Sequence, residues 1–320
     1  MKSQEKVTAF RNGEIKRNRG KGNMGMDTCT LCPRMCGVNR AAGEKGYCGM
    51  DATIRAARAA LHMWEEPCIS GTRGSGAVFF SGCSLRCIFC QNFEIAEGNC
   101  AKEISGERLS EIFLELQEQG AANINLVTAA HYVPAVIESL KKAKAQGMDL
   151  PVIYNSSGYE RVETVQMLEE VVDVWLPDFK YMDSKLAFAY SRAKDYPEVA
   201  RAAIREMMKA AGTCAYDEDG YIQKGVIVRH LILPGHTKNS IAVLDELYGT
   251  YGDDLTISLM NQYTPLPQVR NIPDLNRRVT KREYEKVLDH ALDLGITQGF
   301  FQEGGTAKES FIPLFDYEGL

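Results

Sequence analysis

The sequence lacks any stretch of about 18 consecutive apolar residues, the length that a membrane-spanning helix requires. Its basic, polar N-terminus also lacks the apolar core of a secretory signal peptide. We therefore expect a cytoplasmic protein with no membrane segment. An excess of positive charge is absent too, because the formal net charge is -5 at pH 7. This balance argues against a general nucleic-acid binder.

The chain is long enough for one sizeable core with a small appendage, since it has 320 residues of which 45% are hydrophobic. Residues 1–26 hold seven Lys or Arg and four Gly but few apolar residues, which is typical of a flexible basic arm. The chain has ten cysteines. Without an export signal, their clustering favours reduced thiols that bind metals over disulfides.

Three closely spaced cysteines form the most informative motif. Cys83, Cys87 and Cys90 follow the pattern C-x3-C-x2-C, with no obvious fourth ligand. Iron-sulfur clusters that only carry electrons are usually held by four thiolates, so three would leave one iron open to a substrate or cofactor. Two alternatives are a zinc site with a distant fourth ligand and buried thiols that pack as small apolar groups. The cluster is favoured because zinc ligands usually come as two C-x2-C pairs.

A second set of four cysteines precedes this motif. Cys29, Cys32, Cys36 and Cys48 lie in a stretch rich in Gly, and we expect residues 27–70 to form a small cysteine-rich module. Such a set can bind zinc or a second iron-sulfur cluster that relays electrons, and the spacing does not decide between them. Free cysteines in a loop are the alternative without a metal.

Strand-like and helix-like segments alternate from residue 71 onward. Apolar runs predict strands at 77–80, 124–128, 152–155, 173–176, 226–233, 255–259 and 298–302. A helix between the first two is indicated by apolar residues at helical spacing, with Ser105 as a possible cap and Gly120 as a possible end. We predict an α/β fold in which residues 71–303 form a partial barrel of roughly six or seven βα units, followed by a tail at 304–320.

The cysteine motif resembles that of the radical S-adenosylmethionine (SAM) superfamily, nearest to its branch of glycyl-radical-enzyme activating enzymes, such as the activating enzyme of pyruvate formate-lyase. The resemblance rests on the cysteine spacing, on Phe89 just before the third cysteine and on the lead-in segment AVFFSG. It covers about residues 66–303. The resemblance implies an open barrel of six βα units, a [4Fe-4S] cluster on the three cysteines, and SAM bound to the free iron.

Polar residues that follow the predicted strands are candidates for binding SAM, together with Phe89 beside the cluster. Asn155 and Ser157 lie in YNSSGY, which resembles a Thr-Asn-Gly-aromatic segment of the family, although a turn favours the same residue types. Asp178 and Lys180 in PDFKY resemble the family's Asp-Leu-Lys. They either contact SAM or pair with each other.

Two further candidates are Thr128 and Arg229. Thr128 lies where activating enzymes have a Gly-Gly-Glu segment that contacts the SAM amino group; this chain lacks that segment, but backbone carbonyls can accept from an ammonium whatever the side chain. Arg229 lies within the apolar run VIVRHLIL, where an unpaired guanidinium is costly. It therefore needs an anionic partner such as a carboxylate, and the SAM carboxylate is one candidate.

The resemblance implies a radical SAM oxidoreductase that cleaves SAM reductively to a 5′-deoxyadenosyl radical, with an electron donor such as flavodoxin or ferredoxin as partner. Activation of a glycyl-radical enzyme is the leading hypothesis for its function. Modification of another peptide or a small molecule is the first alternative. A different class of protein, an iron-sulfur electron carrier or a zinc-stabilised interaction protein, stays open, although the predicted barrel is large for such a role.

Overall fold

The computed structural model describes residues 26–302 and 313–320. In this part of the chain, ten strands form one open sheet in the order β10-β9-β8-β6-β5-β4-β2-β1-β3, with β7 paired to β8. The strands are β1 (Arg55–His62), β2 (Ser75–Phe80), β3 (Lys102–Glu103), β4 (Ile124–Val127), β5 (Val152–Ser156), β6 (Val174–Pro177), β7 (Ala215–Tyr216), β8 (Ile222–Leu231), β9 (Thr256–Met260) and β10 (Gly299–Phe301).

The strands from β2 to β10 are parallel to their neighbours along this order, whereas β1 is antiparallel to both β2 and β3. All seven predicted strands are present, as β2, β4, β5, β6, β8, β9 and β10. The predicted α/β fold with a partial barrel is thereby confirmed. The basic arm, apart from Met26, and residues 303–312 lie outside the described residues.

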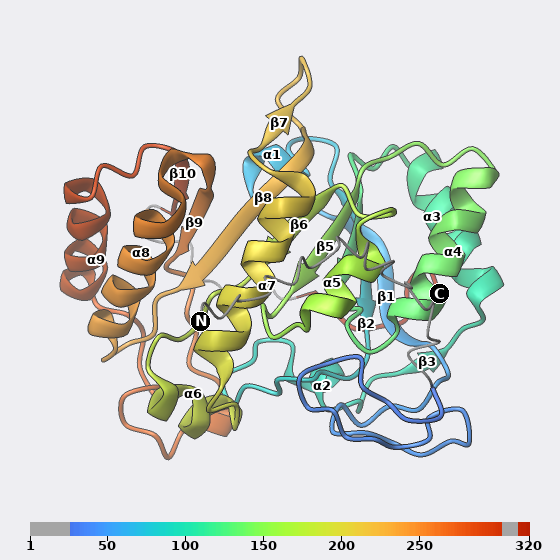
Figure 1. Ribbon diagram of the computed structural model, residues 1–320, viewed down its shortest axis with the longest axis horizontal. Helices are drawn as coiled ribbons and strands as arrows, with labels where there is room; N and C mark the ends of the chain where they lie inside the picture. The colour runs from blue at the N-terminus through green and yellow to red at the C-terminus, as the bar shows by residue number, and fades with distance from the viewer. Residues whose placement is uncertain (1–25, 303–312) are drawn as a thin grey trace, which may run out of the picture.

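The helices of the described chain are α1 (Pro67–Ser70), α2 (Phe93–Ala96), α3 (Gly106–Glu118), α4 (Val133–Ala145), α5 (Val162–Leu168), α6 (Ser184–Ser191), α7 (Tyr196–Ala211), α8 (Thr237–Tyr251) and α9 (Lys281–Asp293). Of these, α3, α4, α5, α7, α8 and α9 cover one face of the curved sheet, whereas α2 and α6 lie at its end (Figure 1). In the described chain none of them is both long and apolar enough to cross a membrane. The α3 helix begins as predicted, because the Ser105 side chain accepts a hydrogen bond from the Arg108 amide.

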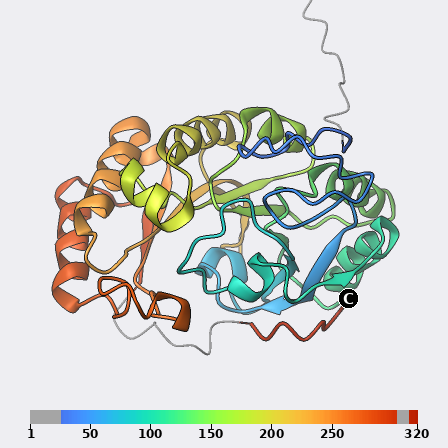
Figure 2. The same ribbon diagram turned by 90° about the horizontal axis from the view of Figure 1, so that it is seen from below.

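The cysteine-rich region differs from its predicted extent. Residues 26–54 form loops at the end of the sheet that also carries α2, and Figure 2 shows both on the same face. Residues 55–70 were expected in the same module, but they form β1 and α1, and β1 pairs with β2 inside the sheet. The run RAARAALH is rich in Ala and Arg, which gives little strand signal in the sequence.

One buried acid stands out in the loop that follows β5. Glu160 is 1% exposed, and its polar neighbour in the interior is the Tyr154 hydroxyl. Burial raises the pKa of Glu160 from its ordinary 4.5 to about 8, because desolvation penalises the charged form. The carboxyl group is therefore protonated in the folded protein at neutral pH.

Glu160→Gln is expected to stabilise the protein near pH 8 more than near pH 5. The raised pKa means that the folded state binds this proton more tightly than the unfolded state does. The stability that the bound proton contributes to the wild type is therefore fully present below about pH 4.5 and is lost as the pH rises to about 8. At about 1.4 kcal/mol per pKa unit, the change amounts to several kcal/mol. Urea unfolding of both proteins at the two pH values measures it. Glu163→Gln, on the exposed face of α5, is the control, and a wild-type pH dependence in Glu160→Gln would contradict the prediction.

Candidate active site

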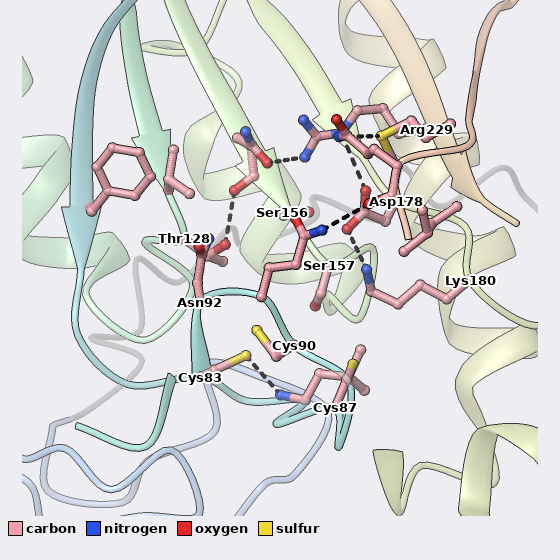
Figure 3. Close-up of a pocket in the computed structure, with 18 of the residues that line it drawn as sticks. Cys83, Cys87, Cys90, Asn92, Thr128, Ser156, Ser157, Asp178, Lys180 and Arg229 are labelled. Carbon is pink, nitrogen blue, oxygen red and sulfur yellow. Dashed lines mark hydrogen bonds and ion pairs between the residues drawn. The ribbon is translucent and has the colours of Figure 1, made fainter. Parts of the chain in front are cut away.

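A pocket opens at the carboxyl ends of the parallel strands, where loops from distant parts of the chain meet. The cysteine loop lies on one side of it, and charged side chains from β8 and from the turn after β6 lie across from that loop (Figure 3). The sequence-predicted residues that line it are Cys83, Cys87, Phe89, Cys90, Thr128, Asn155, Ser157, Asp178, Lys180 and Arg229. The structure therefore brings together every predicted residue outside the set of four cysteines.

The three cysteines of the pocket lie on the loop between β2 and α2. Backbone amides of Leu85 and Arg86 point at the Cys83 sulfur, at 3.4 and 3.5 Å, and the Ser191 hydroxyl donates to the Cys87 sulfur at 3.1 Å. Burial raises the pKa of the Cys87 thiol, while the nearby Lys180 ammonium opposes that effect. Hydrogen bonds to sulfur and a neighbouring cation are features that stabilise thiolates bound to a metal centre.

These thiols suit a cluster better than a single ion. In residues 26–302 and 313–320, no group of three or more His, Cys, Asp or Glu side chains is placed to hold one metal ion. An iron-sulfur cluster is larger and takes one thiolate on each iron, so its ligands surround a wider space. Cys83, Cys87 and Cys90 all line the same pocket, as ligands that surround a cluster must.

Phe89 forms part of an aromatic wall beside the cysteines. It is 5% exposed, and its ring lies 6.2 Å from that of Tyr190, at an interplanar angle of 86°, and 6.4 Å from that of Tyr181. Such edge-to-face contacts fix the ring orientation and keep water out of this side of the pocket. A direct contact of Phe89 with a cofactor stays a prediction.

Asp178 and Lys180 pair with each other across the turn that follows β6. The Lys180 Nζ donates to Asp178 Oδ2 at 2.5 Å, and both side chains are largely buried. Although burial acts to raise the pKa of Asp178, Lys180 and Arg229 hold it below its usual value. The pair is thus charged at neutral pH, and both charges face the pocket.

Arg229 has the anionic partners that its apolar strand predicted. Its guanidinium contacts Glu65 Oε2 at 3.0 Å and Asp178 Oδ1 at 3.3 Å, and it donates to Asn155 Oδ1 at 2.5 Å. Two carboxylates of the chain itself therefore compensate this buried cation. The role of the SAM carboxylate as partner stays a prediction.

Thr128 and Ser157 are partly used by local hydrogen bonds. Thr128 donates from its hydroxyl to the Asn155 carbonyl at 3.1 Å, which joins the ends of β4 and β5. The Ser157 hydroxyl accepts from the Tyr159 amide at 3.4 Å, the kind of contact that shapes a turn. The turn interpretation of Ser157 is therefore realised, and the side chain still lines the pocket.

Sequence analysis missed the residues that β1 and its following loop contribute. Glu65 accepts from Arg229 and from the Asn125 amide group, at 3.0 and 3.1 Å. His62 also lines the pocket, and burial lowers its pKa to about 4, so that its imidazole is neutral. The burial of Arg229 predicted an anionic partner, but no pattern in the sequence around position 65 identified Glu65 as that partner.

A second missed element is the segment 313–320, which lies along β1 (Figure 2). Tyr317 donates its amide to the Ala57 carbonyl at 3.0 Å, and the Ala59 amide donates to the Glu318 carbonyl at 2.8 Å. Arg58 forms ion pairs with Asp316 and Glu318. These contacts add a short extended segment to the edge of the sheet beside the pocket.

Two side chains connect this segment to the site. The Phe315 ring packs on Phe79, with ring centres 5.7 Å apart, and Phe79 lines the pocket. Pro313 lines the pocket directly. The segment 313–320 therefore limits the pocket on the side of β1.

The four cysteines of the N-terminal loops also lie near one another. Burial raises the pKa of Cys32 to about 12, and the neighbouring Cys48 and Cys29 raise it further. Cys29, Cys32 and Cys48 are buried, whereas Cys36 is exposed. Their role in binding a metal stays a prediction.

Residues 70–193 match the family model of a 4Fe-4S single cluster domain. This range contains Cys83, Cys87 and Cys90, so the match supports an iron-sulfur cluster on the pocket loop. The four cysteines of the N-terminal loops precede the matched range.

An uncharacterized protein of Methanocaldococcus jannaschii is 29% identical over 270 residues, which cover 82% of this chain and 74% of that protein. A structure of SuiB from Streptococcus suis bound to S-adenosylmethionine has a TM-score of 0.45 and 14% identity, and covers 69% of this chain and 48% of its own. A domain of pyruvate-formate lyase-activating enzyme from Bacteroides vulgatus has a TM-score of 0.38 and 17% identity, over 54% of this chain and 92% of its own. The chain thus spans about half the length of SuiB.

Arg58→Ala is expected to loosen the segment 313–320 while the rest of the fold stays intact. The change removes two ion pairs and a hydrogen bond to the Leu314 carbonyl, and exposed pairs contribute about 0.2–1 kcal/mol each. Hydrogen exchange at the Tyr317 amide should therefore become roughly 10-fold faster. Arg73→Ala, which removes hydrogen bonds outside this contact, should leave that rate unchanged. Equal rates in all three proteins would show that Arg58 does not hold the segment.

Proposed function

We propose that this protein is a radical SAM enzyme. The observation that carries the proposal is the meeting of three cysteines of one loop with a wall of polar and charged side chains, in a pocket at the carboxyl ends of parallel strands. When bound there, a [4Fe-4S] cluster would supply one electron that breaks a carbon–sulfur bond of SAM, and the products are methionine and a 5′-deoxyadenosyl radical that removes a hydrogen atom from the substrate.

The residues of the pocket match the charges of SAM. The amino-acid end of SAM carries an ammonium and a carboxylate, and Asp178 and Lys180 offer one charge of each sign on the same wall. Arg229 and Glu65 keep that wall charged and fixed without needing a ligand. We assign the first pair to binding and the second pair to positioning.

Apolar side chains of the pocket provide the surroundings that radical chemistry needs. Phe79, Phe89, Leu231 and Met260 line it between the strand ends. These side chains carry no charge and have no titratable proton, so their contribution is to orient the adenosyl group and to exclude water.

We propose activation of a glycyl-radical enzyme as the finer function, in which a backbone glycine of a partner protein is the hydrogen donor. The support is the resemblance of the motif around Cys83, Cys87 and Cys90 to activating enzymes. The electron would come from a partner such as flavodoxin or ferredoxin.

A small molecule or another peptide is the second candidate substrate. It is favoured by Pro313 and Phe315, because the segment that carries them limits the pocket beside β1. The segment 313–320 would obstruct a large loop of a partner protein that approached the pocket from the side of β1.

Anaerobically reconstituted protein with dithionite and SAM should form 5′-deoxyadenosine and methionine, which mass spectrometry measures. Cys87→Ala should abolish both products because it removes one of the three thiolates. Cys214→Ala, a cysteine outside both clustered sets, should retain them. No deoxyadenosine from protein with a full cluster would refute radical SAM chemistry. A glycyl EPR signal that never forms with any glycyl-radical enzyme supplied would refute only the finer function.

Asp178→Asn is expected to weaken SAM binding by about 10-fold or more, since loss of one charged hydrogen-bond partner costs roughly 1.5–3 kcal/mol. Equilibrium dialysis with radiolabelled SAM measures the change. Asp289→Asn, an exposed position on α9, is the matched control. An unchanged affinity in Asp178→Asn would remove the Asp178–Lys180 pair from the binding site.

A further inference from the structure

The N-terminal loops hold four thiols around a compact turn. Cys29 is fixed by two backbone hydrogen bonds of 3.0 Å, from its amide to the Val38 carbonyl and from the Gly37 amide to its carbonyl. A Cβ atom added at Gly46 would lie 2.7 Å from the Cys36 sulfur and 3.9 Å from the Cys48 sulfur. These two thiols, twelve positions apart in the sequence, therefore lie close to the same glycine.

A buried cation without a carboxylate partner lies beside these thiols. Arg40 is 1% exposed, and its terminal nitrogens donate to the backbone carbonyls of His131 and Asp51. Its Nε has no partner among the described residues, and the Asp51 carboxylate is already bound to Arg55 at 2.8 Å. Burying a charge is costly unless an opposite charge compensates it.

Arg40 and Cys48 contact the same short stretch of backbone, because Arg40 donates to the Asp51 carbonyl and the Cys48 thiol points at the carbonyl of the preceding residue, Met50, at 3.9 Å. A metal centre held by four thiolates carries net negative charge and would supply the compensation that no carboxylate of the described chain supplies. This buried guanidinium donates to two carbonyls and lies 5.6 Å from the centre of the Tyr132 ring, but no carboxylate among the described residues pairs with it. It is a second observation, independent of the cysteine spacing, that points to an anionic centre at this place.

The same thiols adjoin the pocket loop. A Cβ atom at Gly82, the residue before Cys83, would lie 2.9 Å from the Cys48 carbonyl oxygen, so backbone touches backbone. Cys36, by contrast, is exposed. The set therefore reaches from the protein surface to the residue next to a pocket cysteine.

Two arginines clamp the N-terminal loops to the pocket loop. Arg34 Nε donates to the Ser84 carbonyl at 2.9 Å, and Arg86 donates to the Tyr47 carbonyl at 3.4 Å. These contacts reach across from one cysteine set to the other. They keep the distance between the two sets fixed, which is a condition for transfer of electrons between them.

We infer that Cys29, Cys32, Cys36 and Cys48 bind a second [4Fe-4S] cluster, which relays electrons from an external donor to the cluster in the pocket. The relay role rests on the proposed function, whereas the metal site does not. A flavodoxin- or ferredoxin-type donor gives one electron at the exposed Cys36 side, and the second cluster returns to its oxidised state when it passes that electron to the pocket cluster. No proton or bond changes place at the relay.

Iron-sulfur is favoured over zinc because the set lies against the pocket loop. A zinc ion that only stabilises the N-terminal loops would need no contact with Gly82 and no exposed edge at Cys36.

Metal analysis of the full chain after anaerobic reconstitution tests the inference. Wild-type protein should contain about eight iron and eight sulfide per chain, and about four of each after Cys29 and Cys32 are both replaced by Ala. Replacing Cys83, Cys87 and Cys90 together should also leave about four, with an EPR signal in the reduced state that SAM does not change. Cys214→Ala is the control and should retain the wild-type content.

Each other outcome overturns the inference. About four iron and one zinc in the wild type would make the second site a zinc site. No iron in the variant without Cys83, Cys87 and Cys90 would show that the four-cysteine set holds no cluster, and this variant answers the question even if the Cys29/Cys32 variant fails to fold. These counts do not depend on SAM cleavage, so they stand apart from a failure of the proposed function.

The relay has its own readout. Dithionite is small enough to reach the pocket, so the Cys29/Cys32 variant should keep SAM cleavage with dithionite within about 3-fold of wild type. With a flavodoxin or ferredoxin as the donor, cleavage should fall at least 10-fold. Equal activity with both donors would refute the relay while leaving the second cluster in place, and equal loss with both would assign the set to stability alone.

Discussion

The buried guanidinium of Arg229 is the contact on which the arrangement of the pocket depends. It joins β8 to Asp178 after β6 and to Glu65 after β1, so one side chain ties three segments of the sheet together. An unpaired guanidinium at this depth would be costly, and therefore the carboxylates of Asp178 and Glu65 stabilise the folded wall. The position of Asp178 in turn fixes Lys180, which faces the cysteine loop.

The two cysteine sets share a physical arrangement. In each, burial raises the pKa of thiols, and a cation nearby opposes that effect, Lys180 beside Cys87 and Arg40 beside Cys48. A buried thiol without a metal is neutral, so metal binding at either set would release protons. The neighbouring cations lower the pKa of the thiols and so favour the thiolate form that binds metal. Metal binding at both sets would therefore depend on pH.

Much of this structure follows from local sequence patterns, and the rest depends on distant contacts. The seven parallel strands are short apolar runs, and the cap of α3 follows from Ser105 at the start of an apolar helix pattern. The spacing of Asp178 and Lys180 placed both on one face. Glu65, by contrast, lies 164 positions from Arg229 and in a segment with no strand signal. A charge pair of this separation leaves no trace in local periodicity. The pairing of the segment 313–320 with β1 likewise joins distant parts of the sequence and could not be predicted from local patterns.

The pairing of β1 with the segment 313–320 has a consequence for how the chain is made. Arg58 and Asp316 are 258 positions apart, so β1 leaves the ribosome long before the segment that covers its edge. During synthesis this edge presents free amides and carbonyls to other nascent chains, a state in which strand edges pair with the wrong partner. The sheet can be finished only after release of the segment from the exit tunnel. Until that point the edge of β1 near Ala57 and Ala59 is open to pairing with other strands.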